Sequence, residues 1–225
     1  MHSQCVQYLP LLTILLDFVL TLIYNAYMQK LHTTSKLILT DADGVLLRWE
    51  QPFRAFMEQR GYVFNQNGIH SYNLKDHYLD ISGPELNQLI VEFNNSEAMR
   101  SLPPLRDAVT YVNKLHMEHN FKFRVITSYG LCQNAIARRE HNLRMLFGNA
   151  IESLVSIEMG APKDHVLAEY AGSGLVWIED KYENFQTGLT VGLKSVLIDH
   201  SHNKSKPIDT GHRATCWKDI YHMLT

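Results

Sequence analysis

From residue 36 onward, short apolar segments alternate with longer segments whose apolar residues recur at helical spacing. The apolar segments are 37–40, 121–126, 153–157, 175–178 and 194–198. The helical patterns are 53–60, 83–93, 105–119, 133–147 and 163–171. Such alternation is typical of an α/β protein with a parallel sheet, and right-handed crossovers make it a three-layer α/β/α sandwich. Because ligands bind at the carboxyl ends of parallel strands, the residues after each strand are the first candidates for a site.

One segment interrupts this alternation. Residues 48–100 lie between the first and second strands and carry mostly helical patterns. They predict a small helical cap, inserted into a core made of residues 36–47 and 101–225. Within the cap, Ser82 before Gly83-Pro84-Glu85 predicts the start of a helix, and the polar stretch 94–104 is a candidate hinge.

The first 35 residues form a separate apolar segment. Residues 8–28 are about as long as a membrane-spanning helix, but Asp17 and Asn25 interrupt the apolar run. Three interpretations stay open: an N-terminal membrane anchor, a packed amphipathic helix, or an extension upstream of a true start at Met28. Two lysines follow the run, so the downstream domain is expected in the cytoplasm even if the segment associates with a membrane.

Charge and composition limit the partners. The 225 residues include 21 Lys and Arg against 23 Asp and Glu, a formal net charge of -2. An extended nucleic-acid surface needs a basic excess, so neither such a surface nor a nucleic-acid end phosphatase is favoured. The 3 cysteines form no CxxC motif and predict no zinc site. His200 and His202 lie in a polar stretch and are expected to be solvated loop residues.

Four of the predicted strands lead into side chains that can do chemistry. In chain order these are Asp41-Ala42-Asp43-Gly44, Thr127-Ser128, Lys163 and Glu179-Asp180. Carboxylates that converge on one crevice repel one another unless a cation joins them. A hard ion held by few carboxylates, with waters and a phosphate oxygen around it, points to Mg²⁺. The set therefore predicts phosphoryl transfer through a covalent intermediate.

Each expected role follows from the side chain. Asp41 can attack phosphorus as a carboxylate nucleophile, and Asp43 can protonate the leaving oxygen and then activate water. Lys163 and Thr127 can neutralise and hydrogen-bond the phosphate oxygens. Gly44 permits a tight turn and offers its backbone amide to the phosphate.

Four motifs between residues 36 and 200 strengthen this interpretation. They are LILTDADGVLL, VITS at 125–128, the lysine of GAPKDHVL and LVWIEDKYENF at 175–185. Together they resemble the motifs of the haloacid dehalogenase-like (HAD) phosphohydrolase superfamily. The resemblance implies Asp41 as nucleophile, Asp43 as acid and base, and Mg²⁺ bound by Asp41, the Asp43 backbone carbonyl and Asp180. It leaves Glu179 as a contact to metal-bound water. The acid at position 43 favours a phosphate ester over a halide, which leaves without a proton.

The stretch TSYGLCQNAIARREHNLRMLFG is similar to the corresponding part of 5'(3')-deoxyribonucleotidases. This likeness implies that Ser128 and Lys163 also bind phosphate, and that the substrate is a (deoxy)nucleoside monophosphate. Trp49 and Phe53 are the cap aromatics nearest in sequence to Asp43, and they could stack on a nucleobase. They could equally belong to the core of the cap.

Two alternatives to a nucleotidase stay open. One is a phosphatase of another small phosphorylated metabolite, such as a sugar phosphate. The other is a non-catalytic, membrane-tethered protein that only binds phosphate or metal. The pair Asp41 and Asp43 counts against the second, because a decayed enzyme typically loses one of the two.

Overall fold

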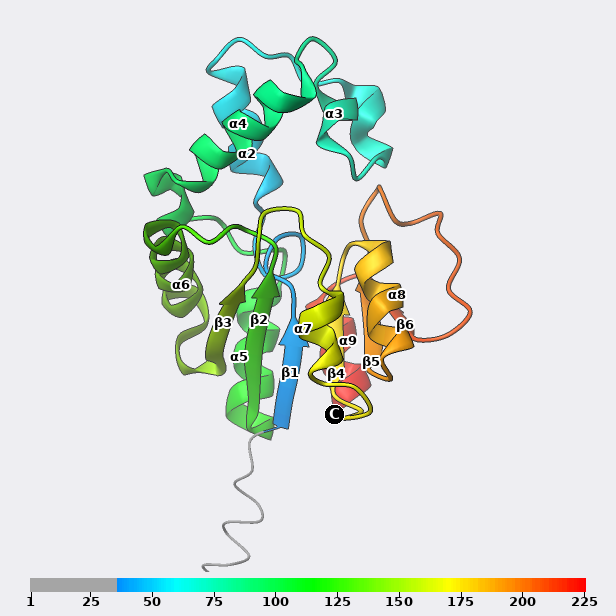
Figure 1. Cartoon of the computed structure of the whole chain (residues 1–225). Helices are drawn as coiled ribbons and strands as arrows, with labels where there is room; N and C mark the ends of the chain where they lie inside the picture. The colour runs from blue at the N-terminus through cyan, green and yellow to red at the C-terminus, as the bar shows by residue number, and fades with distance from the viewer. Residues whose placement is uncertain (1–35) are drawn as a thin grey trace, which may run out of the picture. The chain divides into compact units, whose positions relative to one another are not determined.

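A six-stranded sheet lies at the centre of the protein (Figure 1). The computed structural model describes residues 36–225, so the three interpretations of residues 8–28 lie outside the described residues. The strands are β1 (Lys36–Thr40), β2 (Phe121–Thr127), β3 (Ile151–Ser156), β4 (Val176–Glu179), β5 (Lys194–Ile198) and β6 (His212–Ala214). Their order is β3-β2-β1-β4-β5-β6, and the pairs β2–β3, β1–β4, β4–β5 and β5–β6 are parallel. The arrows of β1, β2 and β3 point the same way in Figure 1. The central strand β1 therefore delivers the residues that follow it to the middle of the carboxyl edge.

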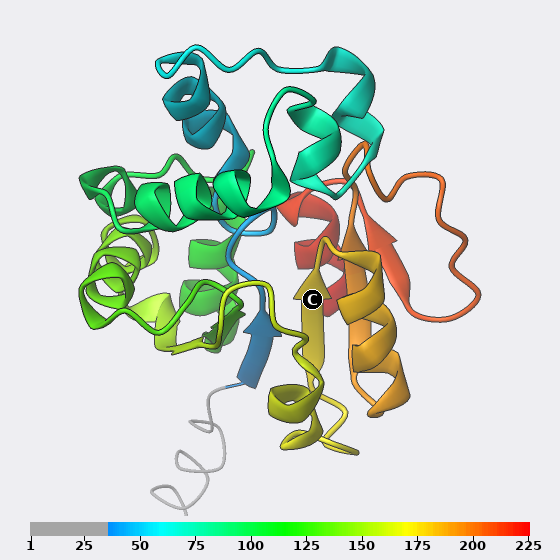
Figure 2. The same ribbon diagram turned by 45° about the horizontal axis from the view of Figure 1, so that its top comes forward.

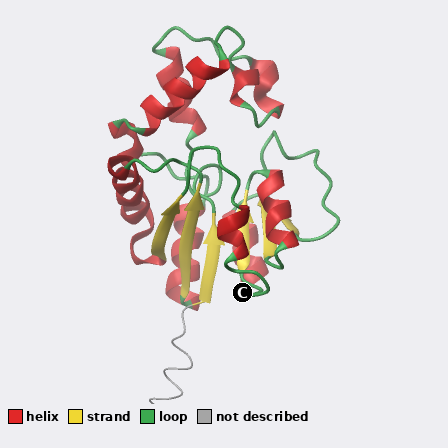
Figure 3. Cartoon of the chain, in the orientation of Figure 1, coloured by secondary structure: helices red, strands yellow, loops and turns green. Residues whose placement is uncertain are grey.

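Helices cover both faces of this sheet (Figure 3). On one face lie α5 (Ala108–His119), α6 (Gln133–Phe147) and α9 (Trp217–Leu224), with the 3₁₀ helix η3 (Gly148–Ala150) after α6. On the other face lie α7 (Asp164–Ala168) and α8 (Tyr182–Thr190). Phe123 and Trp217 meet in the larger core, while Trp177 belongs to a smaller core on the other face. This arrangement confirms the predicted three-layer α/β/α sandwich.

The segment between β1 and α5 folds into short helices beyond the carboxyl ends of the strands (Figures 1 and 2). They are α2 (Glu50–Glu58), the 3₁₀ helix η1 (Gln66–His70), α3 (Leu74–His77), α4 (Gly83–Asn94) and the 3₁₀ helix η2 (Glu97–Arg100). We call residues 50–100 the cap. Its interior is aromatic, with Phe53 packed against Phe56 and Phe93. The Ser82 hydroxyl accepts a hydrogen bond from the backbone N–H of Glu85 at 3.3 Å, so the predicted start of α4 is confirmed.

The shift in the start of α5 has a local cause. Helix α5 begins at Ala108 rather than 105, because the Leu105 N–H donates to the Leu46 carbonyl at 2.8 Å and holds this segment against the turn after β1. The sequence patterns missed α8, β6 and α9. Strand β6 has only three residues, too few for an alternating pattern. Within residues 36–225, no helix combines the length and apolar composition needed to cross a membrane.

Candidate active site

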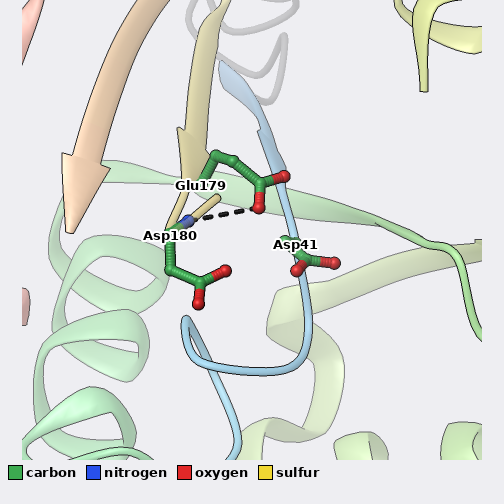
Figure 4. A group of neighbouring side chains, drawn as sticks. All are labelled: Asp41, Glu179 and Asp180. Atoms are coloured by element: carbon green, nitrogen blue, oxygen red, sulfur yellow. Dashed lines mark hydrogen bonds between the residues drawn. The ribbon is translucent and has the colours of Figure 1, made fainter. Parts of the chain in front are cut away.

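The acidic strand ends meet at the carboxyl edge of the sheet. Asp41 follows β1, Glu179 ends β4 and Asp180 comes next, and the Asp41 N–H donates to the Ile178 carbonyl at 2.9 Å. Since β1 and β4 are neighbours, the three carboxyl groups face one another (Figure 4). One oxygen from each lies within 4.8 Å of the others, and all three residues are buried. The predicted convergence of Asp41 with the acidic pair is therefore present.

Lys163 joins two of these carboxylates. Its Nζ lies 2.7 Å from Asp41 Oδ1 and 2.8 Å from Glu179 Oε2, and the side chain is 2% exposed. Burial favours the neutral amine, but Asp41 and Glu179 outweigh it and hold the pKa of Lys163 above its usual value. The residue that opens α7 is therefore a buried cation at neutral pH.

One lysine does not balance three carboxylates. The pKa of Asp41 is raised to about 7: burial is the largest cause, Lys163 opposes it, and the charges of Glu179 and Asp43 add to it. Burial also raises the pKa of Asp180 well above its usual value, with Glu179 and Asp41 adding to the effect. A divalent cation would relieve this repulsion and favour the ionised forms.

The hydrogen bonds at the acidic pair show which of the two carboxylates is free to bind a metal ion. Glu179 Oε1 accepts the backbone N–H groups of Asp180 at 3.2 Å and Lys181 at 3.0 Å. Glu179 Oε2 accepts Lys163 at 2.8 Å and Asn184 at 3.4 Å. Asp180 Oδ1, in contrast, is buried and has no hydrogen-bond partner among the described residues. An orphaned carboxylate oxygen beside Asp41 fits a hard cation such as Mg²⁺.

The turn after Asp43 requires glycine. Gly44 has φ +76°, and a Cβ at this position would lie 2.4 Å from Asp180 Oδ2. Its carbonyl accepts a hydrogen bond from His200 Nε2 at 2.6 Å. The absence of a side chain therefore lets the backbone approach Asp180 and the loop after β5.

That loop brings two histidines into the site. The rings of His200 and His202 stack with centroids 5.4 Å apart, and His202 Nε2 lies 3.5 Å from Asp180 Oδ2. The expectation that both are solvated loop residues is wrong, because both are partly buried and line a cavity. Burial lowers the pKa of His200 to about 4 and also lowers that of His202. The only available signal was their place just after the carboxyl end of β5.

This cavity, of about 420 Å³, lies between the carboxyl edge and the cap. Asp43, Gly44 and Asp180 line its core side, and Trp49 and Tyr72 contribute aromatic surface. The Trp49 Nε1–H donates to Asn94 Oδ1 at 2.8 Å, which fixes the indole in the wall.

Phe53 is placed differently from the expectation. It is 1% exposed and does not line the cavity, and its ring stacks on Trp49 with centroids 4.5 Å apart. The expected stacking of Phe53 on a substrate base is therefore corrected, because the ring supports Trp49 from the cap interior.

Thr127 and Ser128 lie at the end of β2, as expected. Thr127 is buried, and its carbonyl accepts the Ile157 N–H at 3.0 Å. The Ser128 hydroxyl donates to the Ala161 carbonyl at 2.8 Å, which holds the loop that leads to Lys163. Neither residue lines the cavity, so a phosphate contact by either is still a prediction.

Asp43 makes an ion pair that the sequence analysis missed. Both of its carboxylate oxygens accept hydrogen bonds from Arg139 of α6, with Nη2 3.1 Å from Oδ2. Arg139 is completely buried, although its neighbour Arg138 is partly exposed. A signal was present, since Ala135, Arg139 and Leu143 recur every four residues and share one buried face of α6.

No family model matches the chain. It is 28% identical over 197 residues to an uncharacterized 32.4 kDa protein in the Gp30-rIII intergenic region of Enterobacteria phage T4. The similarity covers 83% of this chain and 69% of the phage protein.

Similar solved structures are HAD hydrolases. A haloacid dehalogenase-like hydrolase from Streptococcus pneumoniae has a TM-score of 0.60 at 10% identity and covers 86% of this chain and all of its own. CbbY from Rhodobacter sphaeroides, in complex with phosphate, has a TM-score of 0.56 at 13% identity, and the match covers 83% of this chain and 96% of CbbY. The D,D-heptose 1,7-bisphosphate phosphatase from B. bronchiseptica, complexed with magnesium and phosphate, has a TM-score of 0.50 at 10% identity. The match covers 84% of this chain and 97% of that phosphatase. The chain thus has the α/β fold of the HAD hydrolases.

Proposed function

We propose that the chain is a Mg²⁺-dependent phosphomonoester hydrolase that works through an aspartyl-phosphate on Asp41. The observation that carries the proposal is the buried group at the carboxyl edge, in which Lys163 bridges Asp41 and Glu179 beside the orphaned oxygen of Asp180. Two structures of similar fold hold phosphate, one of them with magnesium. Asp43, an acid that can protonate a leaving oxygen, favours a phosphate ester over a halide, which leaves without a proton.

In the first half-reaction, a carboxylate oxygen of Asp41 attacks phosphorus and the bond to the leaving oxygen breaks. Asp43 lines the cavity and gives its proton to that leaving oxygen, so an alcohol is released. Lys163 contacts Asp41 directly, so it can orient the nucleophile and neutralise a phosphate oxygen. The buried hydroxyl of Thr127 is the further proposed donor. The expected contact of the Gly44 amide with phosphate is corrected, because that N–H already donates to the Leu47 carbonyl at 2.9 Å.

In the second half-reaction, Asp43 takes a proton from water as the water oxygen attacks phosphorus. The Asp41–phosphate bond breaks and inorganic phosphate is released. Asp41, Asp180 and the Asp43 carbonyl are the proposed ligands of Mg²⁺, which when bound screens the approach of one anion to another. Glu179, whose oxygens are already engaged, is assigned to holding Lys163 and the backbone after β4.

The proposed substrate is a small phosphorylated metabolite, with (deoxy)nucleoside monophosphates first. A cavity of about 420 Å³ falls within the usual range of ligand sites, and Trp49 and Tyr72 offer aromatic surface to a base. A sugar phosphate is the second candidate, since Arg48, Gln51 and Arg54 in the lining could bind hydroxyl groups.

The test is phosphate release by the full chain with and without Mg²⁺. Deoxynucleoside, ribonucleoside and sugar phosphates would be offered side by side. We expect Asp41→Asn to remove activity, while Glu169→Gln, a carboxyl-to-amide change at an exposed position of the chain, keeps it. Equal release by Asp41→Asn and the parent would contradict the proposal and favour a protein that only binds phosphate or metal.

A further inference from the structure

The burial of the Arg139 guanidinium is energetically unfavourable, and the proposed reaction does not by itself explain why it is there. Its side chain is completely buried, and its Nε has no hydrogen-bond partner among the described residues. A buried guanidinium is unfavourable unless a carboxylate pairs with it. Asp43, whose side chain is 30% exposed to the cavity, is that partner.

We propose that Arg139 is a positioning residue that holds the acid/base carboxylate Asp43 and connects it to the junction between cap and core. This role rests on the proposed phosphatase function. Two parallel N–H donors fix the plane of a carboxylate as well as its place. Each Asp43 oxygen keeps a further lone pair, so the carboxyl group can still meet a leaving oxygen or a water.

The opposite side of Arg139 faces the residues where the cap returns to the core. The guanidinium lies 4.4 Å from the centroid of the Tyr129 ring, and Nη2 lies 3.7 Å from Met99 Sδ in η2. The Tyr129 hydroxyl donates to the carbonyl of Asn94, the last residue of α4.

The side chain of the same asparagine extends the connection to the wall of the cavity. Asn94 Oδ1 accepts the Trp49 Nε1–H at 2.8 Å, just before α2 begins. Arg139 is thus linked, through Tyr129 and Asn94, to both chain connections of the cap. The position of the cap and the orientation of the Asp43 carboxylate are therefore coupled through the buried side chain of Arg139.

A misplaced Asp43 has a chemical signature that general unfolding does not. Proton transfer matters for a poor leaving group such as an alcohol and little for p-nitrophenolate, which leaves without a proton. Loss of general acid catalysis costs about 10²–10⁴-fold. A positioning fault should therefore change the ratio of two kcat/KM values rather than scale both equally.

The experiment compares benzyl phosphate with p-nitrophenyl phosphate in the full chain with Mg²⁺. We expect Arg139→Gln to lower kcat/KM for benzyl phosphate about 100-fold. The factor by which kcat/KM falls for p-nitrophenyl phosphate should be at least about tenfold smaller. Arg139→Lys keeps the positive charge but loses the two parallel N–H donors, so its ratio of the two kcat/KM values should lie between those of the parent and Arg139→Gln. Arg138→Gln, the same change one residue earlier, should leave the ratio unchanged.

A second pair of variants covers the case in which Arg139→Gln does not fold, as thermal melting would show. Tyr129→Leu removes the ring from the guanidinium, whereas Tyr129→Phe keeps it. Tyr129→Leu should lower kcat/KM for benzyl phosphate more than for p-nitrophenyl phosphate, and Tyr129→Phe, which loses only the hydroxyl link to Asn94, should do so to a smaller extent. Adding Arg139→Gln to Asp43→Asn should cause little further loss for benzyl phosphate.

Two outcomes separate the possible failures. In the first, Asp41→Asn abolishes phosphate release, while the Arg139 and Tyr129 variants lower kcat/KM for both esters by the same factor. The positioning role is then overturned, and the proposed phosphatase function stands. If neither ester is cleaved by the parent more than by Asp41→Asn, the proposed function fails, and the role of Arg139 fails with it.

Discussion

The carboxyl edge of the sheet and the cap-side wall of the cavity hold their side chains in different ways. At the edge, Asp41, Lys163 and Glu179 are all under 10% exposed and are bonded to one another or to backbone groups. In the wall, Tyr72 is 51% exposed. Arg54, another wall residue, pairs with the exposed Glu58 of its own helix.

This difference suggests a division of labour. The edge is fixed by neighbouring strands, so it suits a reaction whose geometry must not vary. The wall is built from short helices and half-exposed side chains, so it can suit one leaving group or another without disturbing the chemistry. If the division is correct, changes at the edge act on turnover and stability, and changes in the wall act on substrate binding.

The largest effect is expected for Lys163→Met. The change leaves Asp41 and Glu179 buried without their shared cation, and breaking a buried ion pair costs about 3–5 kcal/mol. Loss of one preorganised group also lowers kcat about 10²–10³-fold. Urea unfolding and phosphate release measure the two effects, with the exposed Lys218→Met as control. Unchanged turnover in Lys163→Met would remove the edge from the catalytic proposal.

The same contrast explains what the sequence could predict. Asp41, Lys163 and Asp180 are fixed by the order of strands, because each follows or precedes an element whose apolar pattern is clear. A parallel sheet with right-handed crossovers then brings those ends together whatever the loops do. The fold and the acidic edge could therefore be predicted without coordinates.

The wall could not be predicted in this way. Phe53 and Trp49 both carry large aromatic side chains, and only the packing of α2 on α4 decides that one is interior and the other faces the cavity. His202 reaches Asp180 from a loop that begins after β5, and its pattern contains no periodicity to place it. Nearness in sequence to Asp43 is a poor guide where short helices turn the chain.

A pair of substitutions, one inside the cap and one just before it, separates packing from binding. Phe53→Ala removes a ring from the cap interior and should lower the free energy of unfolding by about 3–5 kcal/mol. Trp49→Leu changes the cavity wall instead, and should raise KM for a nucleoside monophosphate about tenfold while kcat stays within about twofold. For both variants, steady-state kinetics gives kcat and KM, and urea unfolding gives the free energy of unfolding. A larger effect on kcat than on KM for Trp49→Leu would place the wall in the chemistry and end the contrast.

The smallest effect concerns pH and Mg²⁺ at the edge. Because burial raises the pKa of Asp41 to about 7, the metal-free folded chain binds a proton that the unfolded chain has already lost above its ordinary value of 3.8. This contribution to stability is complete below that ordinary value, falls as pH rises toward 7, and is gone above it. Mg²⁺ needs the ionised carboxylates, so its binding should strengthen over the same interval.

We therefore expect Mg²⁺ to raise Tm more at pH 8 than at pH 5.5. At a concentration 100 times Kd, a bound ion adds about 2.7 kcal/mol, or about 5–10 °C for a domain of this size. Asp180→Asn, which alters the proposed ligand with the orphaned oxygen, should lose the increment, and Glu169→Gln should keep it. The same Tm shift at both pH values, or an undiminished shift in Asp180→Asn, would mean that Mg²⁺ binds elsewhere, and that the buried carboxylates are held by Lys163 alone.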